Sequence, residues 1–512
     1  MKLKNETFWF AAILCIVLFG FGLRMRNINQ PIVEIMEARQ TQTAEISRNL
    51  IADSFNIFLP RVNRYGPDNP YVVLEFPLFN LIAALSARIT GLPLEPVGRF
   101  WSGVFGILGC WIWYLFLKRH YPLRAIVPGM IFYLFTFIGI ITGRSFQPDT
   151  LSLFWFLWVL LELDACYSKN NFESARWRLG ILTALACLTK APMAVLLVVP
   201  LAALLWRLYQ SGDIGPGKAV SFLMICFVPI LLWTVHGSLI HARFPNYMTS
   251  NYGLENWFKP GLFFSTENFN YYFNFWLQFR YSFLTSRSAA LDWIVGLILL
   301  ASVVELLRNA GKRKFFLPIV ISLGTYYFLF NFHTATHFYY HLPLLPVLTA
   351  GLTHLAAKLP PVSFFGMLSV VVTASLINIH TAGNYMQEDE SQIQLIDCAN
   401  IVREVVPQGG LLLTSYQDQS GLEYYSNRVG WIFIMEREYH KKHFKIAHDT
   451  SSFTTDHIEA MQEFKKLGAG YYANCDPGSL QRYPRFSSYM FKNFKTVYSD
   501  PQKLFIFKLN SR

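Results

Sequence analysis

The sequence predicts a mainly α-helical membrane protein, a polytopic bundle of about 11 spans followed by a small C-terminal α/β domain. Charged residues make up only 15% of the chain and hydrophobic residues 53%, with a mean hydropathy of +0.30. Ordinary soluble domains carry about 25% charged residues, so lipid is the expected solvent. Apolar runs close to the length that spans a bilayer recur along the chain: Phe8–Leu23, Phe100–Leu117, Ala125–Thr142, Leu151–Cys166, Val220–Val235 and Phe364–Ile379.

The chain divides into a membrane domain, residues 1–382, and a soluble tail, residues 383–512. The first apolar run has no small-residue cleavage site and ends in basic residues, so we interpret it as an uncleaved span. Two long excursions interrupt the membrane domain, at residues 27–73 and 236–291. The second is rich in Tyr, Trp, Phe and Asn, a composition typical of the bilayer interface.

The tail has the alternating pattern of a small α/β domain. Helical spacing covers Ser391–Val405 and Asp456–Leu467, and short apolar runs predict strands. The predicted strands are Leu411–Thr414, Ala469–Ala473, Thr496–Tyr498 and Leu504–Leu509. The tail contains no nucleotide-binding glycine loop or catalytic triad, so we expect it to be a structural cap or an acceptor-recognition domain.

Charge distribution predicts the orientation. The net charge is +12, and the positive-inside rule places Arg308–Lys314 in the cytoplasm. Both excursions and the tail then lie outside the cell membrane. The middle is ambiguous: Leu179–Trp206 is either one long span or a hairpin broken at Lys190-Ala191-Pro192, and the hairpin obeys the rule better. Basic residues form no continuous aromatic-lined stripe, which argues against nucleic acid.

Carboxylates follow the first span directly, in the segment PIVEIMEARQTQTAEISRNLI. Glu34 and Glu37 are three residues apart and share one face of a predicted helix, with Arg39 close by. The segment is either an amphipathic helix lying on the bilayer or a site where partial burial shifts the carboxyl pKa for proton transfer or cation binding. Farther along, Arg61 precedes Glu75 at the next apolar run, as interfacial anchors or as part of a phosphate clamp.

Two charges stand at or inside apolar runs. Asp149 begins one run, five residues after Arg144, and is either a helix cap or a functional carboxylate. Lys190 lies in the middle of another, where its side chain can hardly reach water. Because Pro192 follows, Lys190 is interpreted as an ammonium presented to a buried anion at a helix break.

A late segment, NFHTATHFYYHLPLLP, combines histidines with tyrosines. His333, His337 and His341 recur at helical spacing beside Tyr339 and Tyr340. Metal binding is one interpretation, although no HExxH motif is present and the seven cysteines show no metal spacing. Aromatic packing at the interface and binding of phosphate or sugar are the others.

In this order the motifs resemble the GT-C superfamily of multi-span glycosyltransferases. The resemblance covers roughly residues 1–380: one span, the acidic loop, PR…EFPL, Arg144 and Asp149 before a span, LTKAP, and H.YY.LPL.P from His337. It is strongest to bacterial proteins similar to protein O-mannosyltransferases and lipid A aminoarabinose transferases. No single motif carries the resemblance, only their order and topology.

The resemblance implies transfer of a sugar from a polyprenyl-phosphate donor to an extracytoplasmic acceptor, with inversion. Glu34 or Glu37 would take the place of the first-loop catalytic acid and Asp149 that of the second, with Lys190 and Arg144 at the lipid phosphate. The chain has separated Glu34 and Glu37 where the family has an Asp-Glu pair. No cofactor is certain, and a divalent cation is possible. The alternatives are a lipid-linked sugar transporter or flippase, and a non-catalytic envelope-polysaccharide assembly protein.

Overall fold

The chain folds into two compact units. The structure is a computed structural model that describes residues 2–169, 172–246, 258–259, 261, 268–285, 287–387, 390–415, 421–433 and 456–510. The first unit comprises Met1–Ile28, Gly98–Trp233 and Gly253–Asn384. The second comprises Asn29–Val97, Thr234–Tyr252 and Tyr385–Arg512.

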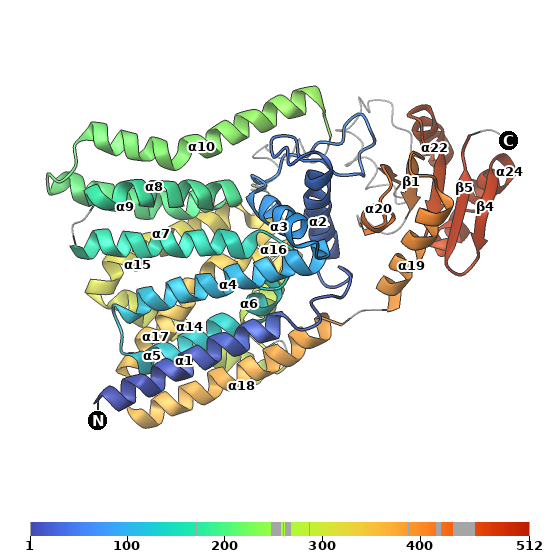
Figure 1. The fold of residues 1–512 in the computed structure, drawn as a ribbon. Helices are drawn as coiled ribbons and strands as arrows, with labels where there is room; N and C mark the ends of the chain where they lie inside the picture. The colour runs from blue at the N-terminus through green and yellow to red at the C-terminus, as the bar shows by residue number, and fades with distance from the viewer. Residues whose placement is uncertain are drawn as a thin grey trace. The chain divides into compact units, whose positions relative to one another are not determined.

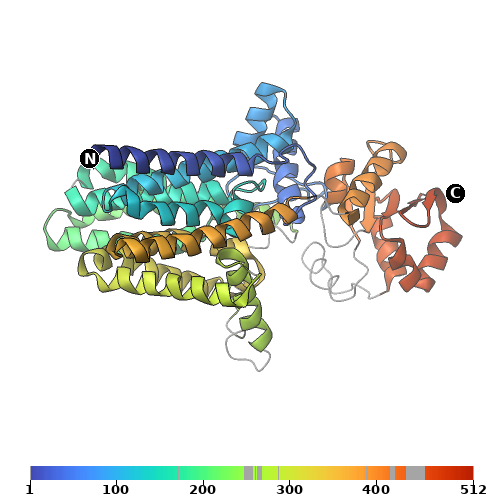
Figure 2. The same cartoon turned by 90° about the horizontal axis from the view of Figure 1, so that it is seen from below.

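The first unit is a bundle of long helices that lie side by side (Figures 1 and 2). Its helices are α1 (Lys2–Arg24), α4 (Leu94–Lys118), α5 (Leu123–Phe135), α6 (Phe137–Thr142), α7 (Asp149–Lys169), α8 (Phe172–Thr189), α9 (Met193–Gln210), α10 (Pro216–Arg243), α13 (Asn268–Phe283), α14 (Ala289–Arg308), α15 (Ala310–Leu329), α16 (Asn331–Thr336), the 3₁₀ helix η1 (Phe338–Leu344), α17 (Leu345–Lys358) and α18 (Pro361–Tyr385). The first residues of α4 and the last of α10 belong to the second unit.

Length and composition identify the membrane-crossing helices. Seven helices in the described part of the chain are long and apolar enough to cross a membrane, namely α1, α4, α7, α9, α10, α14 and α18. Helix α7 is buried on most sides, whereas α10 exposes Leu231, Leu232 and Leu239, as a lipid-facing helix does. The shorter or more polar α5, α8, α15 and α17 pack among them. The chain is therefore a multi-pass membrane protein.

Two breaks shape the bundle. Helix α5 ends before Thr136, whose side chain caps α6, and the buried guanidinium of Arg24 donates to the carbonyls of Leu134 (2.9 Å) and Gly139 (2.7 Å). These bonds satisfy carbonyl groups near the ends of α5 and α6, which short helices leave without a partner in their own backbone. The second break separates α8 from α9 at residues 190–192, as the hairpin interpretation predicts, because a proline cannot continue the ladder of hydrogen bonds.

The tail contains a five-stranded sheet of order β2-β1-β3-β5-β4. The strands are β1 (Leu412–Ser415), β2 (Gly430–Ile432), β3 (Tyr471–Asn474), β4 (Lys495–Asp500) and β5 (Leu504–Lys508). Strand β1 runs parallel to both of its neighbours, β2 and β3. Strand β5 runs antiparallel to both of its neighbours, β3 and β4. The tail helices are α19 (Glu390–Val405), α20 (Gly421–Ser426), α22 (His457–Lys466), α23 (Pro477–Arg482) and α24 (Pro484–Asn493). Leu412 packs with α19 and Leu413 with α22 and α24, so helices cover both faces of the sheet.

The first long excursion, residues 27–73, is called the first loop from here on. It folds together with the tail in the second unit. It contains α2 (Glu37–Ala52), which packs against the following helix α3 (Leu78–Thr90), where the Asn80 side chain donates to the Thr43 carbonyl at 2.8 Å. Its chain then pairs with β2, since Gly66 donates to the Gly430 carbonyl at 2.7 Å and Gly430 to that of Asn63 at 2.8 Å. Gly66 has φ +74° and lies against Trp431, where a side chain would collide with the indole.

Candidate active site

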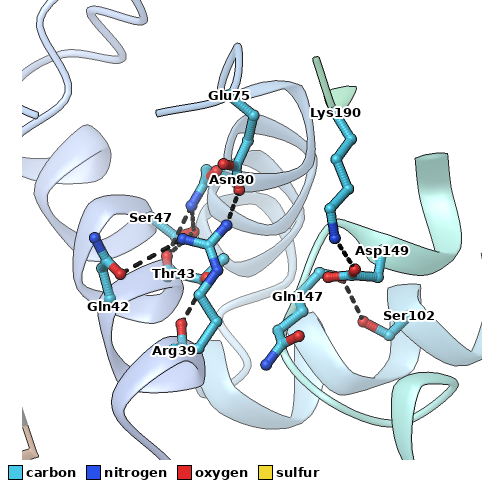
Figure 3. Close-up of polar contacts among 10 residues, drawn as sticks. All are labelled: Arg39, Gln42, Thr43, Ser47, Glu75, Asn80, Ser102, Gln147, Asp149 and Lys190. Atoms are coloured by element: carbon cyan, nitrogen blue, oxygen red, sulfur yellow. Dashed lines mark hydrogen bonds and ion pairs between the residues drawn. The ribbon is translucent and has the colours of Figure 1, made fainter. Parts of the chain in front are cut away.

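A buried ion pair joins the start of α7 to the break that follows α8. Asp149 begins α7 and Lys190 follows the last turn of α8, and the ammonium binds the carboxylate directly (Figure 3). The Asp149 side chain is only 3% exposed and that of Lys190 17%. Each charge suits its helix end, because a carboxylate is stabilised at an amino terminus and an ammonium at a carboxyl terminus. The anion that faces Lys190 in the structure is therefore the carboxylate of Asp149.

Aromatic side chains cover the lysine. Its Nζ lies 5.0 Å from the centroid of the Tyr339 ring and 4.7 Å from that of Tyr340. Helix η1 carries both tyrosines, and the Tyr326 hydroxyl fixes it by donating to the Tyr340 carbonyl at 3.0 Å. The π faces attract the ammonium and leave room for the carboxylate on another side.

The histidines contact this group through tilted and edge-on ring pairs. The His333 ring lies 5.0 Å from that of Tyr340, and the His337 ring 5.4 Å from that of Tyr339. Burial, reinforced by His337 and Lys190, lowers the pKa of His333 to about 4. His333 is thus a neutral imidazole at pH 7 and adds no positive charge beside Lys190.

A metal site at the histidines is not supported by their geometry. The segment changes from α16 to η1 between His333 and His341, so the expected helical face is interrupted. His341 instead contacts the Tyr327 hydroxyl and the Thr334 carbonyl, each at 3.0 Å. Across the described ranges, no three His, Cys, Asp or Glu side chains converge to hold a metal ion.

Arg144 lies in the turn before α7, fully buried, with Nη2 3.4 Å from the Asn27 carbonyl. The same turn is fixed by Ser102, whose hydroxyl donates to the carbonyls of Ser145 (2.5 Å) and Gln147 (3.3 Å; Figure 3). The turn therefore holds the start of α7, and Asp149 with it, in one position.

In the second unit, the structure pairs Arg39 with Glu75, two of the predicted binding residues (Figure 3). Arg39 Nη1 also approaches Gln42 Oε1 at 3.5 Å. A cavity of about 10 Å³ lies beside the pair, enough for about one water. Arg61 lies elsewhere in the first loop, where Nε and Nη2 both bind Asp53, with 2.9 Å between Nη2 and Oδ1.

The two first-loop glutamates are both buried but lie in different surroundings. Glu34 precedes α2 and accepts a hydrogen bond from Gln30 at 2.8 Å. Glu37 is the first residue of α2, and neither of its carboxyl oxygens has a hydrogen-bond partner among the described residues. Its carboxyl group lies against Gly421 in the tail, where a Cβ would collide with it.

A second buried carboxyl group, Glu423, lies beside Glu37. Burial and the charge of Glu423 raise the pKa of Glu37 to about 8. Burial raises the pKa of Glu423 itself to about 7, although a bond from the Thr414 hydroxyl opposes that shift. Sequence reasoning missed Glu423, because nothing in the spacing of the tail indicates that α20 packs against α2.

The helical bundle and the α/β tail have the same fold as solved GT-C glycosyltransferases, as the motif order predicts. ArnT from Cupriavidus metallidurans has this fold in its apo structure, with 14% identity and a TM-score of 0.62 over 98% of each chain. The structure of the same ArnT bound to undecaprenyl phosphate has 13% sequence identity and a TM-score of 0.61, over 99% of this chain and 98% of the ArnT chain.

A second solved structure agrees. The Archaeoglobus fulgidus oligosaccharyltransferase, tethered with an acceptor peptide, is 14% identical with a TM-score of 0.63, over 100% of this chain and 75% of that one. Residues 68–233 match the family of dolichyl-phosphate-mannose-protein mannosyltransferases. No curated protein matches the sequence.

Proposed function

We propose that the protein is a membrane glycosyltransferase that moves a sugar from a polyprenyl-phosphate-linked donor to an acceptor outside the cell membrane, with inversion at the anomeric carbon. The observation that carries the proposal is the buried Asp149–Lys190 pair under the rings of Tyr339 and Tyr340. The fold adds support, because a protein that shares it was crystallised with undecaprenyl phosphate.

The ion pair supplies both charges that such a transfer needs. An ammonium has three N–H donors, and Asp149 Oδ1 engages Lys190 through one contact, so phosphate oxygens can take the others. When a phosphate binds, Lys190 exchanges one anion for another and remains compensated. Asp149 is then available as a proton acceptor.

The reaction breaks the bond between the anomeric carbon and the phosphate oxygen. The acceptor hydroxyl attacks that carbon from the opposite side, its proton passes to a carboxylate, and the bonding pair leaves with polyprenyl phosphate. Lys190 stabilises the charge that grows on the departing phosphate, an effect that is strongest where water is excluded. The faces of Tyr339 and Tyr340 can stack on the sugar ring.

Asp149 and Glu37 are the two candidates for the base. Asp149 is in direct contact with the Lys190 ammonium, and it can accept a proton once a bound phosphate takes its place there. Glu37 has a pKa raised to about 8, and it becomes an effective acceptor only as the pH approaches that value. Turnover that rises as the pH approaches 8 would therefore indicate Glu37 as the base. Glu34, Arg39, Glu75, Arg144 and His337 stay proposed contacts to donor or acceptor.

The test is incubation of the purified full chain with a panel of polyprenyl-phosphate sugars, measuring polyprenyl-phosphate release and glycosidic product. We expect Asp149→Asn to lower turnover by about 10²-fold or more. Glu162→Gln is the matched control, because Glu162 also lies on α7 and is also ion-paired, to Arg178 at 2.9 Å. Full turnover in Asp149→Asn would contradict the proposal, and translocation of lipid-linked sugar without any product would indicate a transporter.

A further inference from the structure

A second charged group lies at the end of the membrane bundle opposite to Asp149. Helix α7 runs from Asp149 to Lys169, so Asp164 lies about 22 Å farther along its axis. Around Asp164, the ends of α4, α7 and α9 and the first turns of α15 enclose a cavity of about 230 Å³. A cavity needs only about 10–15 Å³ to hold one water, so this one has room for a ligand group.

The acid in this cavity is already neutralised. Asp164 Oδ2 lies 3.1 Å from Arg119 Nη1, and its Oδ1 lies 2.7 Å from His120 Nε2. Both carboxylate oxygens are therefore engaged, and Asp164 leaves no net negative charge in the cavity.

Three further cations line the same cavity, namely Arg207, Lys312 and Lys314. None of them forms an ion pair with a carboxylate among the described residues, although Asp164 also attracts Lys312. Arg207 donates to the Tyr167 carbonyl at 3.1 Å and lies 5.0 Å from the centroid of its ring. Lys312 lies 4.9 Å from the ring of Tyr121. Carbonyl and π contacts position a cation but do not neutralise it, so the cavity has an excess of positive charge.

The backbone adds to that charge. Gly311 and Lys312 belong to the first turn of α15, which begins at Ala310, and both line the cavity. The amino terminus of a helix carries partial positive charge and favours anions. Phe315 and Phe316 form part of the wall next to the cations, so the cavity combines an anion site with apolar surface.

We propose that this cavity binds a phosphate group, either the head group of an anionic membrane lipid or a soluble phosphate ester. Basic pockets between the ends of membrane helices suit lipid phosphates, and guanidinium groups match phosphate oxygens in geometry. The site is separate from the Asp149–Lys190 pair and does not depend on sugar transfer. Its occupant would fix the ends of α7, α9 and α15 relative to one another.

The test compares two double variants of the full chain that lose the same charge. Lys312→Gln with Lys314→Gln removes two cavity cations, whereas Arg308→Gln with Arg313→Gln removes two neighbouring cations that do not line it. Native mass spectrometry measures binding of phosphatidylglycerol against phosphatidylcholine, and calorimetry measures binding of inorganic phosphate and glycerol 1-phosphate. We expect the cavity variant to lose on the order of tenfold in phosphatidylglycerol affinity and the control to stay within about twofold.

Each outcome decides the proposal. Selective loss of phosphatidylglycerol binding in the cavity variant supports a lipid head group. Selective loss of inorganic phosphate or glycerol 1-phosphate binding, with equal lipid binding in both variants, supports a soluble ester. If neither type of ligand distinguishes the two double variants, the cavity is not a phosphate site.

Discussion

The two units bury acidic side chains in opposite ways. In the membrane unit, Asp149 lies against Lys190, so the buried acid has a side chain of opposite charge beside it. In the second unit, Glu37 lies beside Glu423, and burial of two like groups raises the pKa of Glu37 to about 8 and that of Glu423 to about 7. The first arrangement places a cation against a buried carboxylate, whereas the second stores a proton that leaves near neutrality.

Removal of Lys190 has the largest expected effect, because it leaves Asp149 buried without its cation. We expect Lys190→Met to lower turnover by about 10²-fold or more and to destabilise the bundle by about 3–5 kcal/mol. Polyprenyl-phosphate release and thermal unfolding in detergent measure the two effects.

The double variant Lys190→Met with Asp149→Asn separates stability from chemistry. With both charges removed, the bundle should regain most of its unfolding temperature, since no uncompensated ion stays buried. Turnover should stay low, because neither the phosphate contact nor the carboxylate is restored. Recovery of turnover together with stability would mean that the pair is only structural.

The like-charged pair predicts that the second unit loses stability as the pH rises. In the unfolded chain a glutamate releases its proton near pH 4.5, but Glu37 holds its proton up to about pH 8 in the fold. Between these values the folded state binds more protons, so the free energy of unfolding falls with pH, by at most about 1.4 kcal/mol per pH unit for each carboxyl group. Hydrogen exchange in α2 and α20, corrected for intrinsic rates, measures the opening free energy from pH 5 to 8.

Glutamine variants sharpen this prediction. Glu37→Gln should flatten the pH dependence, because the amide has no proton to lose. Glu423→Gln should flatten it in part and lower the pKa of Glu37, because the neighbouring charge disappears. A wild-type opening free energy that does not change between pH 5 and 8 would show that the two carboxyl groups are not buried together.

The sequence predicts the fold well because its strongest signals are local. Apolar runs of spanning length mark the bundle, Pro192 marks the break after Lys190, and alternating apolar residues mark β1, β3, β4 and β5 within about two residues. It did not predict β2, which has only three residues, Gly430–Ile432, and depends on pairing with β1 and with the first loop.

The site was predictable only in part, for the same reason. A lone charge in an apolar run can be recognised from its neighbours in the sequence, so Asp149 and Lys190 could be chosen as candidate site residues. The proline in the LTKAP segment also predicted that the lysine lies at a helix break. Their pairing depends on how α7 packs against α8 and α9, which no spacing encodes. The contact between Glu37 and Glu423 joins segments nearly four hundred positions apart, and a glutamate in a tail helix gives no local sign of burial.

The contact between α2 and α20 can be tested through Gly421. A Cβ at this position would collide with the Glu37 carboxyl group and with Leu395, so we expect Gly421→Ala to destabilise the second unit by about 1–3 kcal/mol. Gly409→Ala is the matched control, because nothing lies within 4 Å of a Cβ there. The opening free energy from hydrogen exchange measures both. Equal values for the two variants would mean that Glu37 does not pack on Gly421.

Arg61 should give the smallest effect, because its ion pair with Asp53 is partly exposed. We expect Arg61→Gln to lower stability by about 0–1 kcal/mol. Asp53 engages Nε and Nη2, which leaves Nη1 of the guanidinium for another anion. If that anion is the donor phosphate, Arg61→Gln should raise the KM for the donor by roughly tenfold, measured by polyprenyl-phosphate release at varied donor concentration.

Asp53→Asn is the control that separates the two roles of Arg61. It breaks the same ion pair, so it should cost about the same stability, within about 1 kcal/mol. It keeps the guanidinium, however, so the KM for the donor should rise much less than in Arg61→Gln. Equal KM values in the two variants would mean that Arg61 only fastens the end of α2 and does not bind the donor phosphate.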